Sequence, residues 1–209
     1  PKAKSAGKVD QQLLSFVDLA PTVLSLAGIK IPKTIQGRAF LGSQKAKQPR
    51  EYIYAARDRM DSEYDRVRAV RDARYKYIRN YQPEKPFYQN IRYRLQQPGM
   101  RDILRLKEEG KLTLQQARWF ETKPTEELYD CESDPYEFTN LANDPAYATK
   151  LKELRQAMDQ WQQQYGDYGA TREMDMVRQW WGGSLENSPP TTAVPVVSLQ
   201  KGRVQVRCA

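Results

Sequence analysis

The most regular pattern of apolar and polar positions in the chain lies in residues 146–165. Apolar and aromatic side chains recur there every three or four residues, which places them on one face of an α-helix. These positions are Tyr147, Leu151, Leu154, Met158, Trp161 and Tyr165. Asp144-Pro145 is a helix start signal and Gly166 is a stop signal. We expect the apolar face to dock on a sheet of the same chain; the alternative is an amphipathic helix that binds a partner.

Shorter patterns predict the strands of that sheet. Residues 51–56 are rich in β-prone side chains, and two alternating runs at 66–71 and 74–79 are separated by two turn residues, which predicts a hairpin. Residues 126–130 indicate one more strand. A small antiparallel sheet of about four strands, packed on the long helix, gives an α+β fold.

Residues 10–42 predict a short helix followed by a loop. Asp18 is the N-cap candidate, Pro21 lies in the first turn, where its missing N–H costs nothing, and Gly28 provides the left-handed stop. The apolar residues of this helix are expected to form a buried stripe, and they are Val23, Leu24 and Leu26.

The remaining segments show weaker patterns. Residues 100–109 and 113–120 predict two short helices with Gly110 between them. The glycines and prolines of residues 167–200 are typical of a linker or a surface strap. Residues 203–208 alternate like a strand, and we expect the rest of its sheet to lie beyond the chain, which would then be a piece of a longer protein.

Composition narrows the chemistry. The 209 residues include 34 Lys and Arg, 26 Asp and Glu and no histidine, for a net charge of +8. Without an imidazole, the chain acting alone has no Ser-His or Cys-His nucleophile, no His general base and no His-ligated zinc. Two cysteines, Cys131 and Cys208, make neither a disulfide framework nor a Cys-rich zinc site. The sequence contains no run of about 18 apolar residues, so it predicts no transmembrane segment.

The densest polar cluster is residues 56–65, which we expect to form a loop directly after the first strand. Arginine forks suit planar anions such as sulfate, and neighbouring carboxylates can hold sugar hydroxyls or position the arginines. The alternative is a solvated loop joined by salt bridges. The basic residues with tyrosines at 66–79 are typical of a single-stranded nucleic acid platform, but intermixed acids favour a charged outer sheet face, and we expect no nucleic acid partner.

Two other candidate sites fail on inspection of the sequence. A calcium loop of the EF-hand type that started at Asp130 would need Gly at its sixth position and Glu at its twelfth, where the chain has Pro135 and Leu141. Cys131 has acidic neighbours and no histidine to activate it, so we expect a small packed residue rather than a nucleophile.

Three segments together resemble the C-terminal part of type I sulfatases, which belong to the alkaline phosphatase superfamily. They are Leu14–Ile29 with Pro32 and Gln36-Gly37-Arg38, then residues 66–80, and then Glu127–Asp130 with Asp134-Pro135, Asn140-Leu141 and Asp144-Pro145. The resemblance implies three parts. Residues 1–50 would end a catalytic α/β domain, 51–167 would form the C-terminal subdomain, and 168–209 would be a linker with the first strand of an appended β-sandwich.

The resemblance also implies a parent enzyme that hydrolyses sulfate esters or sulfamates of sulfated glycans with formylglycine and calcium. Formylglycine is made in a Cys-x-Pro-Ser-Arg motif, whereas Cys131 is followed by Glu-Ser-Asp-Pro, so no catalytic or metal residue is carried over. We therefore expect the chain alone to be inactive and to need the missing N-terminal catalytic domain as its partner.

In many sulfatases the loop after the first subdomain strand faces the mouth of the sulfate pocket. The resemblance thus implies that Arg57, Arg59 and Asp61 bind the sugar or acidic group beyond the scissile sulfate. It also implies a periplasmic or extracellular location. The rival function is a basic binding module for sulfated polysaccharide or nucleic acid that uses the net positive charge.

Overall fold

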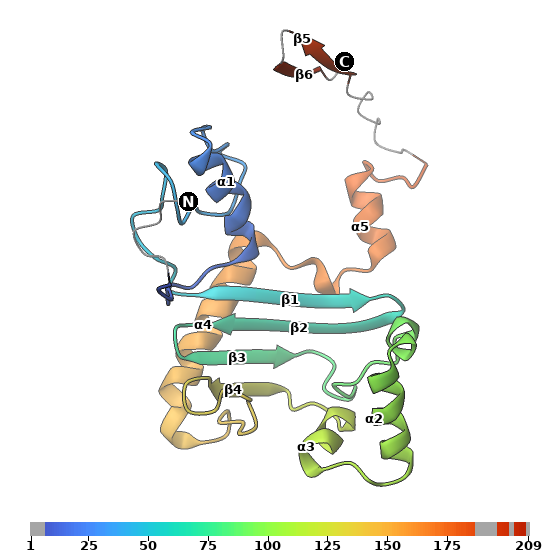
Figure 1. Cartoon of the computed structure of the whole chain (residues 1–209). Helices are drawn as coiled ribbons and strands as arrows, with labels where there is room; N and C mark the ends of the chain where they lie inside the picture. The colour runs from blue at the N-terminus through green and yellow to red at the C-terminus, as the bar shows by residue number, and fades with distance from the viewer. Residues whose placement is uncertain (1–6, 187–195, 201–202, 208–209) are drawn as a thin grey trace. The chain divides into compact units, whose positions relative to one another are not determined.

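The computed structural model describes residues 7–186, 196–200 and 203–207 (Figure 1). The chain divides into two compact units, residues 1–166 and 167–209. The first unit is built on a four-stranded antiparallel sheet in the order β1-β2-β3-β4. Its strands are β1 (Ile53–Met60), β2 (Glu63–Arg71), β3 (Tyr75–Asn80) and β4 (Glu126–Asp130). The predicted α+β fold is confirmed.

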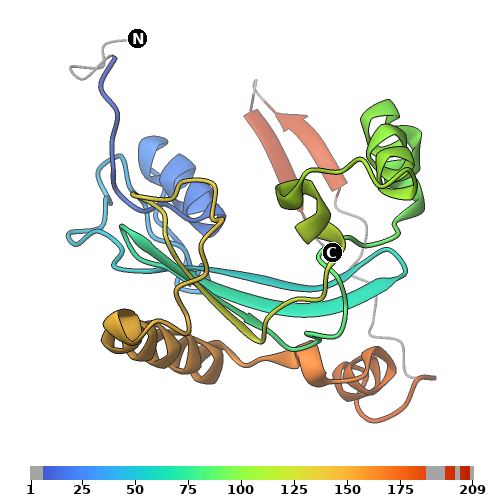
Figure 2. The same ribbon diagram turned by 90° about the horizontal axis from the view of Figure 1, so that it is seen from below.

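One helix, α4 (Ala148–Tyr165), covers a single face of this sheet (Figure 2). A one-turn 3₁₀ helix, η4 (Pro145–Tyr147), leads into α4, and Asp144 caps η4 by accepting a hydrogen bond from Ala146 N at 2.9 Å. α1, α2 and α3 lie on the opposite face of the sheet (Figure 2). The expectation that the helix docks on a sheet of its own chain is therefore confirmed.

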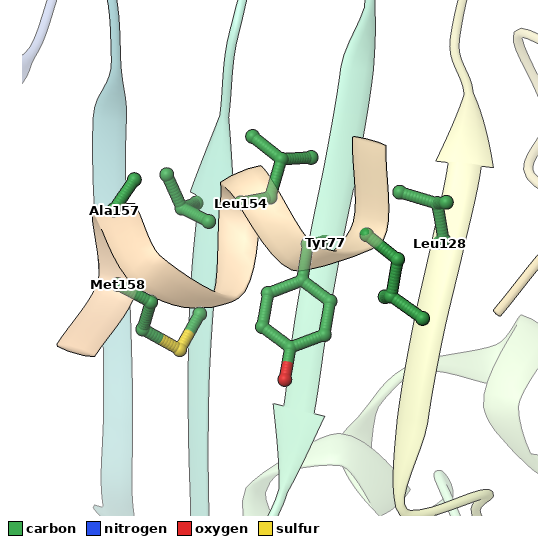
Figure 3. Close-up of a cluster of buried hydrophobic side chains, with 7 residues drawn as sticks. Tyr77, Leu128, Leu154, Ala157 and Met158 are labelled. Carbon is green, nitrogen blue, oxygen red and sulfur yellow. The ribbon is translucent and has the colours of Figure 1, made fainter. Parts of the chain in front are cut away.

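The core forms where α4 meets the sheet (Figure 3). Alternate residues of the strands point toward α4, so one residue from each of three neighbouring strands is fully buried. The core residues are Val70, Tyr77, Leu128, Leu151, Leu154, Ala157 and Met158. At the edge of the core, the rings of Tyr54 and Trp161 stack with centroids 4.9 Å apart. The hydrophobic face expected from the sequence therefore contacts the sheet.

The segment 56–65 is not a loop, and that prediction is wrong. Its residues form the end of the β1–β2 hairpin, with Arg59 opposite Tyr64 and Met60 opposite Glu63. The turn is short because Asp61 adopts a left-handed backbone with φ of 52°, a conformation that Asp tolerates better than most residues. A bulge shifts the register between Arg57 and Arg59. The sequence did not predict these strands because its charged residues show no alternation of apolar and polar positions.

The N-terminal helix α1 (Leu19–Leu26), which follows the 3₁₀ helix η1 (Phe16–Asp18), buries a polar face. The expected apolar stripe is wrong for this chain, since Val23 and Leu26 are 64% and 62% exposed. Thr22 and Ser25 are buried instead, because their hydroxyl oxygens accept hydrogen bonds from the backbone of the following loop. Gly28 ends the helix with φ of 71°, as expected.

The buried carboxylate of Asp18 ties three segments of the N-terminal region together. It accepts hydrogen bonds from Ser15 N at 3.0 Å, from Arg38 N at 2.8 Å and from Arg50 Nε at 2.6 Å. Burial raises the pKa of Asp18, but the hydrogen bonds from Arg50, Arg38 and Ser15 outweigh burial and leave that pKa below its ordinary value of 3.8. Asp18 is thus held as a carboxylate that organises the loop after α1.

Short helices connect β3 to β4, as expected, with Gly110 between them in a left-handed conformation (φ 66°). These are η2 (Arg92–Gln96), α2 (Pro98–Glu108), α3 (Leu114–Ala117) and η3 (Arg118–Phe120). Among the described residues, no helix combines the length and the apolar character needed to cross a bilayer.

The second unit contains more structure than its composition predicted. Its elements are η5 (Tyr168–Ala170), α5 (Glu173–Trp180), β5 (Val196–Gln200) and β6 (Arg203–Arg207). The sequence prediction missed α5, and it was wrong to place the partner of the last strand beyond the chain, because β5 pairs with β6. The prolines expected in the linker lie outside the described residues.

Loss of the Asp18 charge should change how stability depends on pH. Because the folded-state pKa is lowered, the carboxylate stabilises the fold at pH values above about 4, and this contribution disappears as the pH falls through the folded-state pKa. Asp18→Asn should lower the free energy of unfolding at pH 7 by about 1–3 kcal/mol and flatten its decline toward acid pH. Urea unfolding at several pH values measures both effects.

Asp102→Asn is the matched control, because Asp102 is exposed on α2 and makes only a long ion pair of 3.7 Å with Arg105. That variant should leave the unfolding free energy and its pH dependence unchanged within about 0.5 kcal/mol. An Asp18→Asn variant that behaves like the control would contradict the role given to Asp18.

Candidate functional site

The β1–β2 hairpin positions the three site residues expected from the sequence. Arg57 and Arg59 lie on β1 and Asp61 lies in the turn. The structure brings two of them together, since Arg59 Nε donates a hydrogen bond to the backbone oxygen of Asp61 at 2.8 Å at the exposed tip. Arg57 is separate from that pair and reaches toward Asp65 on β2.

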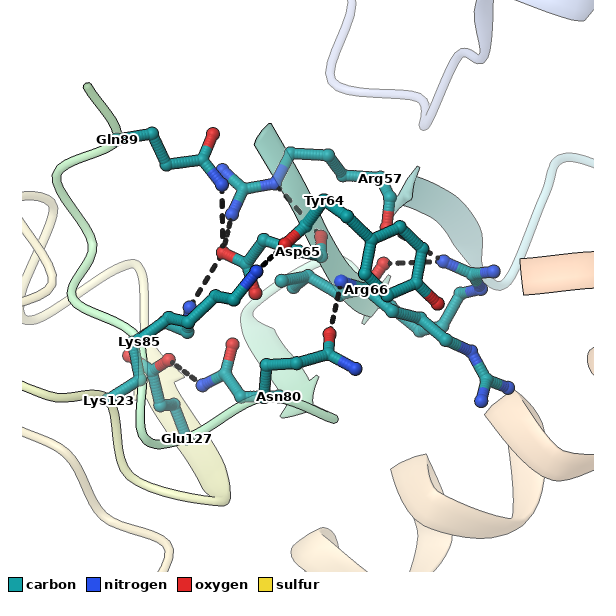
Figure 4. Close-up of polar contacts among 12 residues, drawn as sticks. Arg57, Tyr64, Asp65, Arg66, Asn80, Lys85, Gln89, Lys123 and Glu127 are labelled. Carbon is teal, nitrogen blue, oxygen red and sulfur yellow. Dashed lines mark hydrogen bonds and ion pairs between the residues drawn. The ribbon is translucent and has the colours of Figure 1, made fainter. Parts of the chain in front are cut away.

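Asp65 is a fully buried carboxylate at the start of β2 (Figure 4). Its Oδ2 atom forms ion pairs with Arg57 Nη2 and with Lys123 Nζ, the latter at 2.6 Å. Gln89 Nε2 donates to the same oxygen at 3.3 Å. The Lys123 side chain is itself only 2% exposed, so a carboxylate, an ammonium and a guanidinium share a site largely removed from water.

This buried network extends along the face of the sheet opposite α4. Glu127 Oε1 accepts a hydrogen bond from Asn80 Nδ2 at 2.6 Å, and Glu127 Oε2 accepts one from the Tyr129 hydroxyl. Burial, and then the hydrogen bond with Glu127, raises the pKa of Tyr129. Asn80 Nδ2 also donates to the Pro124 carbonyl at 2.8 Å, which fixes the segment before β4. We call Asp65, Lys123, Asn80, Glu127 and Tyr129 the buried polar layer.

A cleft of about 470 Å³ lies beside the buried polar layer. Ile78, Glu127 and Tyr129 contribute to it from β3 and β4. Its other main lining residues are arginines and aromatic residues from β1, η2, η3 and the turn after β4, namely Arg57, Arg94, Arg118, Trp119, Tyr136 and Phe138. Of these residues, only Arg57 was expected from the sequence. Tyr136 and Phe138 lie in an acidic segment, which the sequence suggested only as a candidate calcium loop.

The described part of the chain contains neither an activated nucleophile nor a metal centre. Burial raises the pKa of the Cys131 thiol, which keeps it protonated, and Cys131 Sγ lies 3.9 Å from Glu137 Oε1. No cluster of three or more His, Cys, Asp or Glu side chains suited to a metal ion occurs among the described residues. These residues do not fit the calcium ion implied by the resemblance.

Comparison with known proteins places this geometry in a family. Residues 1–91 match the family model for the C-terminal region of N-sulphoglucosamine sulphohydrolase. An ulvan-active sulfatase of Formosa agariphila is 49% identical over 209 residues, which is 100% of this chain and 35% of that protein. The chain belongs to the sulfatase family. The resemblance inferred from the sequence is confirmed, and the basic binding module is not favoured.

More distant sulfatases agree with this assignment. Human N-sulphoglucosamine sulphohydrolase is 28% identical over 171 residues, covering 76% of this chain and 34% of that protein. The solved structure of a 2-O GAG sulfatase is 27% identical with a TM-score of 0.52, covering 79% of this chain and 28% of that chain. This sulfatase chain thus spans about a third of the length of the curated relatives it matches.

Removal of the buried ammonium should destabilise this sulfatase chain strongly. Lys123→Met keeps a long side chain but removes the buried ammonium that pairs with Asp65, and breaking a buried ion pair costs about 3–5 kcal/mol. Lys111→Met, which removes an exposed lysine paired with Glu109, should cost less than about 1 kcal/mol.

Chemical denaturation followed by circular dichroism measures both variants. The double variant Lys123→Met with Asp65→Asn should be more stable than the sum of the two single losses predicts, because it removes both buried charges together. Equal and small losses for Lys123→Met and Lys111→Met would show that the buried ion pair does not hold the fold.

Proposed function

We propose that this chain is the C-terminal part of an enzyme that hydrolyses sulfate esters of a sulfated glycan. The observation that carries the proposal is the 49% identity with an ulvan-active sulfatase along the whole chain. A second ulvan-active sulfatase of the same organism is 33% identical over 172 residues, which supports the same substrate class. In this enzyme the chain supports the catalytic domain and contributes one wall of the substrate pocket.

The catalytic centre, in this proposal, belongs to residues upstream of the chain. A formylglycine residue and a calcium ion would supply the nucleophile and the charge that holds the sulfate. The described residues offer neither a histidine nor a metal cluster, which supports assigning them to binding and support rather than to bond breaking.

The exposed apolar face of η1 and α1 is the surface that would meet the upstream catalytic domain. Phe16 is 90% exposed, and Val23 and Leu26 continue the same apolar surface along the helix. Asp18 holds this helix from its polar side, so its apolar side is presented in a fixed orientation. Apolar surface of this kind marks interaction sites in soluble proteins.

Arg59 and Asp61 at the hairpin tip, with Arg57 behind them, would bind the sugar or acidic group beyond the scissile sulfate. The exposed tip and the Arg59–Asp61 contact support this role, since a guanidinium fork suits a planar anion. We also infer that the parent enzyme works in the periplasm or outside the cell, where polymeric sulfated glycans are met.

The location of the catalytic centre can be tested directly. The full-length parent protein should release sulfate from a chromogenic aryl sulfate, whereas the 209-residue chain should release none. Circular dichroism of the chain confirms that it is folded in the assay. Sulfate release by the folded chain alone would overturn the proposal.

The rim residues can be tested in the full-length protein. Arg59→Gln should raise KM for a sulfated oligosaccharide about tenfold and leave kcat within twofold, because the lost contact acts on the bound substrate and not on the reacting bond. Asp61→Asn should act in the same direction.

Arg105→Gln is the matched control, since it removes the same charge from the exposed face of α2, where Arg105 pairs with Glu109 at 2.8 Å. Its kinetic constants should match those of the wild type. Unchanged KM values in both rim variants would refute their role while leaving the sulfatase assignment intact.

A further inference from the structure

The cleft beside the buried polar layer contains two positive charges without a negative partner. Among the described residues, no carboxylate lies within ion-pair distance of Arg94 or Arg118. Arg118 Nη1 donates to the Phe138 carbonyl and Arg94 Nη1 to the Gln89 carbonyl at 3.5 Å, so both keep charge and further donors for a ligand. Both guanidiniums are only half-exposed, which strengthens their attraction for an anion.

The acids that line the cleft do not neutralise these arginines. Glu137 forms an ion pair with Lys76. Glu127 is occupied by Asn80 and Tyr129 in the buried polar layer. The cleft therefore presents a net positive surface, and an anion that enters it meets two arginine forks that can bind sulfate or carboxylate oxygens in pairs.

Aromatic rings stand beside these charges. Tyr136 and Phe138 are 78% and 49% exposed, and their rings lie nearly parallel with centroids 6.0 Å apart. Trp119 adds a third ring, with the Arg94 guanidinium 5.9 Å from its centroid. The chain leaves Tyr136 and Phe138 at the surface rather than in its core, and Trp119 is half-buried. Rings exposed in a cleft bind ligands that have an apolar face, and the C–H face of a sugar ring is such a surface.

The walls of the cleft are joined to each other and to the sheet. The Arg118 hydrogen bond to the Phe138 carbonyl links η3 to the aromatic turn. Asp134 Oδ2 accepts a hydrogen bond from Thr139 N at 2.7 Å, which closes that turn on itself. A binding surface held in this way loses little conformational entropy when a ligand binds.

We infer that this cleft is a subsite for an anionic sugar ring of the glycan substrate, bound by Arg94 and Arg118 and stacked on Trp119, Tyr136 and Phe138. The volume of about 470 Å³ lies within the range of small-ligand sites. Arg57 lines the cleft and lies two residues from Arg59 on the same strand, so one oligosaccharide can contact both places. The inference rests on the proposed function, because it assigns part of the same substrate to this chain.

The experiment compares a long and a short substrate in the full-length protein. The double variant Arg94→Gln with Arg118→Gln should weaken binding of a tetrasaccharide of alternating uronate and sulfated sugar rings by about 10–100-fold. Its kcat/KM for a small aryl sulfate should stay within twofold of wild type. Trp119→Ala should weaken tetrasaccharide binding about tenfold. Titration calorimetry and steady-state kinetics supply the two measurements.

The matched control is Arg101→Gln with Arg105→Gln, which removes the same two charges from the exposed face of α2. It should leave tetrasaccharide affinity unchanged, whereas a general electrostatic effect would weaken binding equally in both double variants and overturn the inference. A neutral tetrasaccharide, without sulfate or carboxylate groups, should bind wild type weakly and show little response to the cleft variants. Arg118→Lys, which keeps the charge but not the fork, should fall between wild type and Arg118→Gln.

The outcomes separate this inference from the proposed function. If the full-length protein cleaves the aryl sulfate but the cleft variants bind the tetrasaccharide like wild type, the cleft is not a subsite and the sulfatase function stands. If upstream residues cover the cleft, the double variant lowers the melting temperature without a selective loss of tetrasaccharide binding, which also overturns the inference. If no sulfate ester is cleaved but binding depends on the two arginines, the subsite stands and the proposed function fails.

Discussion

Strand alternation sends Val70, Tyr77 and Leu128 to one face of the sheet, and it sends Asp65 and Glu127 to the other face. The first face is covered by α4 and stabilised by apolar burial. On the second face, Asp65 is paired with Arg57 and Lys123. Glu127 accepts hydrogen bonds from Asn80 and Tyr129. These contacts stabilise the face because an unpaired buried charge would cost several kcal/mol. The segment between β3 and β4 supplies Lys123 and Gln89 to Asp65, so the polar chemistry of this face helps to fix where that long connection lies.

The same constraint separates arginines with a structural role from those that remain available to a ligand. Arg57 forms an ion pair with the fully buried carboxylate of Asp65, which Lys123 also contacts. Arg59, one bulge further along β1, donates a hydrogen bond to the Asp61 carbonyl at the exposed hairpin tip. Arg94 and Arg118 are anchored through carbonyl oxygens, which orient a guanidinium without neutralising it. Position relative to the buried carboxylate therefore decides which arginines keep a net charge at the surface.

The sequence predicted an element correctly where its pattern of apolar positions had a single physical cause. It failed where the element depends on contacts with distant residues. The period of Leu151, Leu154 and Met158 reflects apolar burial alone, and α4 was placed correctly. Residues 56–65 form strands through backbone pairing although most of their side chains are charged, which leaves no apolar alternation to find. Lys123 gave no signal, because its burial depends on an aspartate 58 positions away. Site residues that are assembled by tertiary contacts could not be recognised from spacing along the chain.

The apolar surface at α1 and the cleft differ in chemistry, and this difference is why we propose different occupants for them. Phe16, Val23 and Leu26 present apolar groups without polar anchors, a surface that gains stability only when another protein surface excludes water from it. The cleft presents guanidiniums whose remaining donors need oxygen partners, so an apolar protein surface placed there would leave charges desolvated and unpaired. A hydrated anionic sugar satisfies those donors and also stacks on Tyr136 and Phe138. Domain contact at α1 and glycan contact at the cleft are thus compatible within one enzyme.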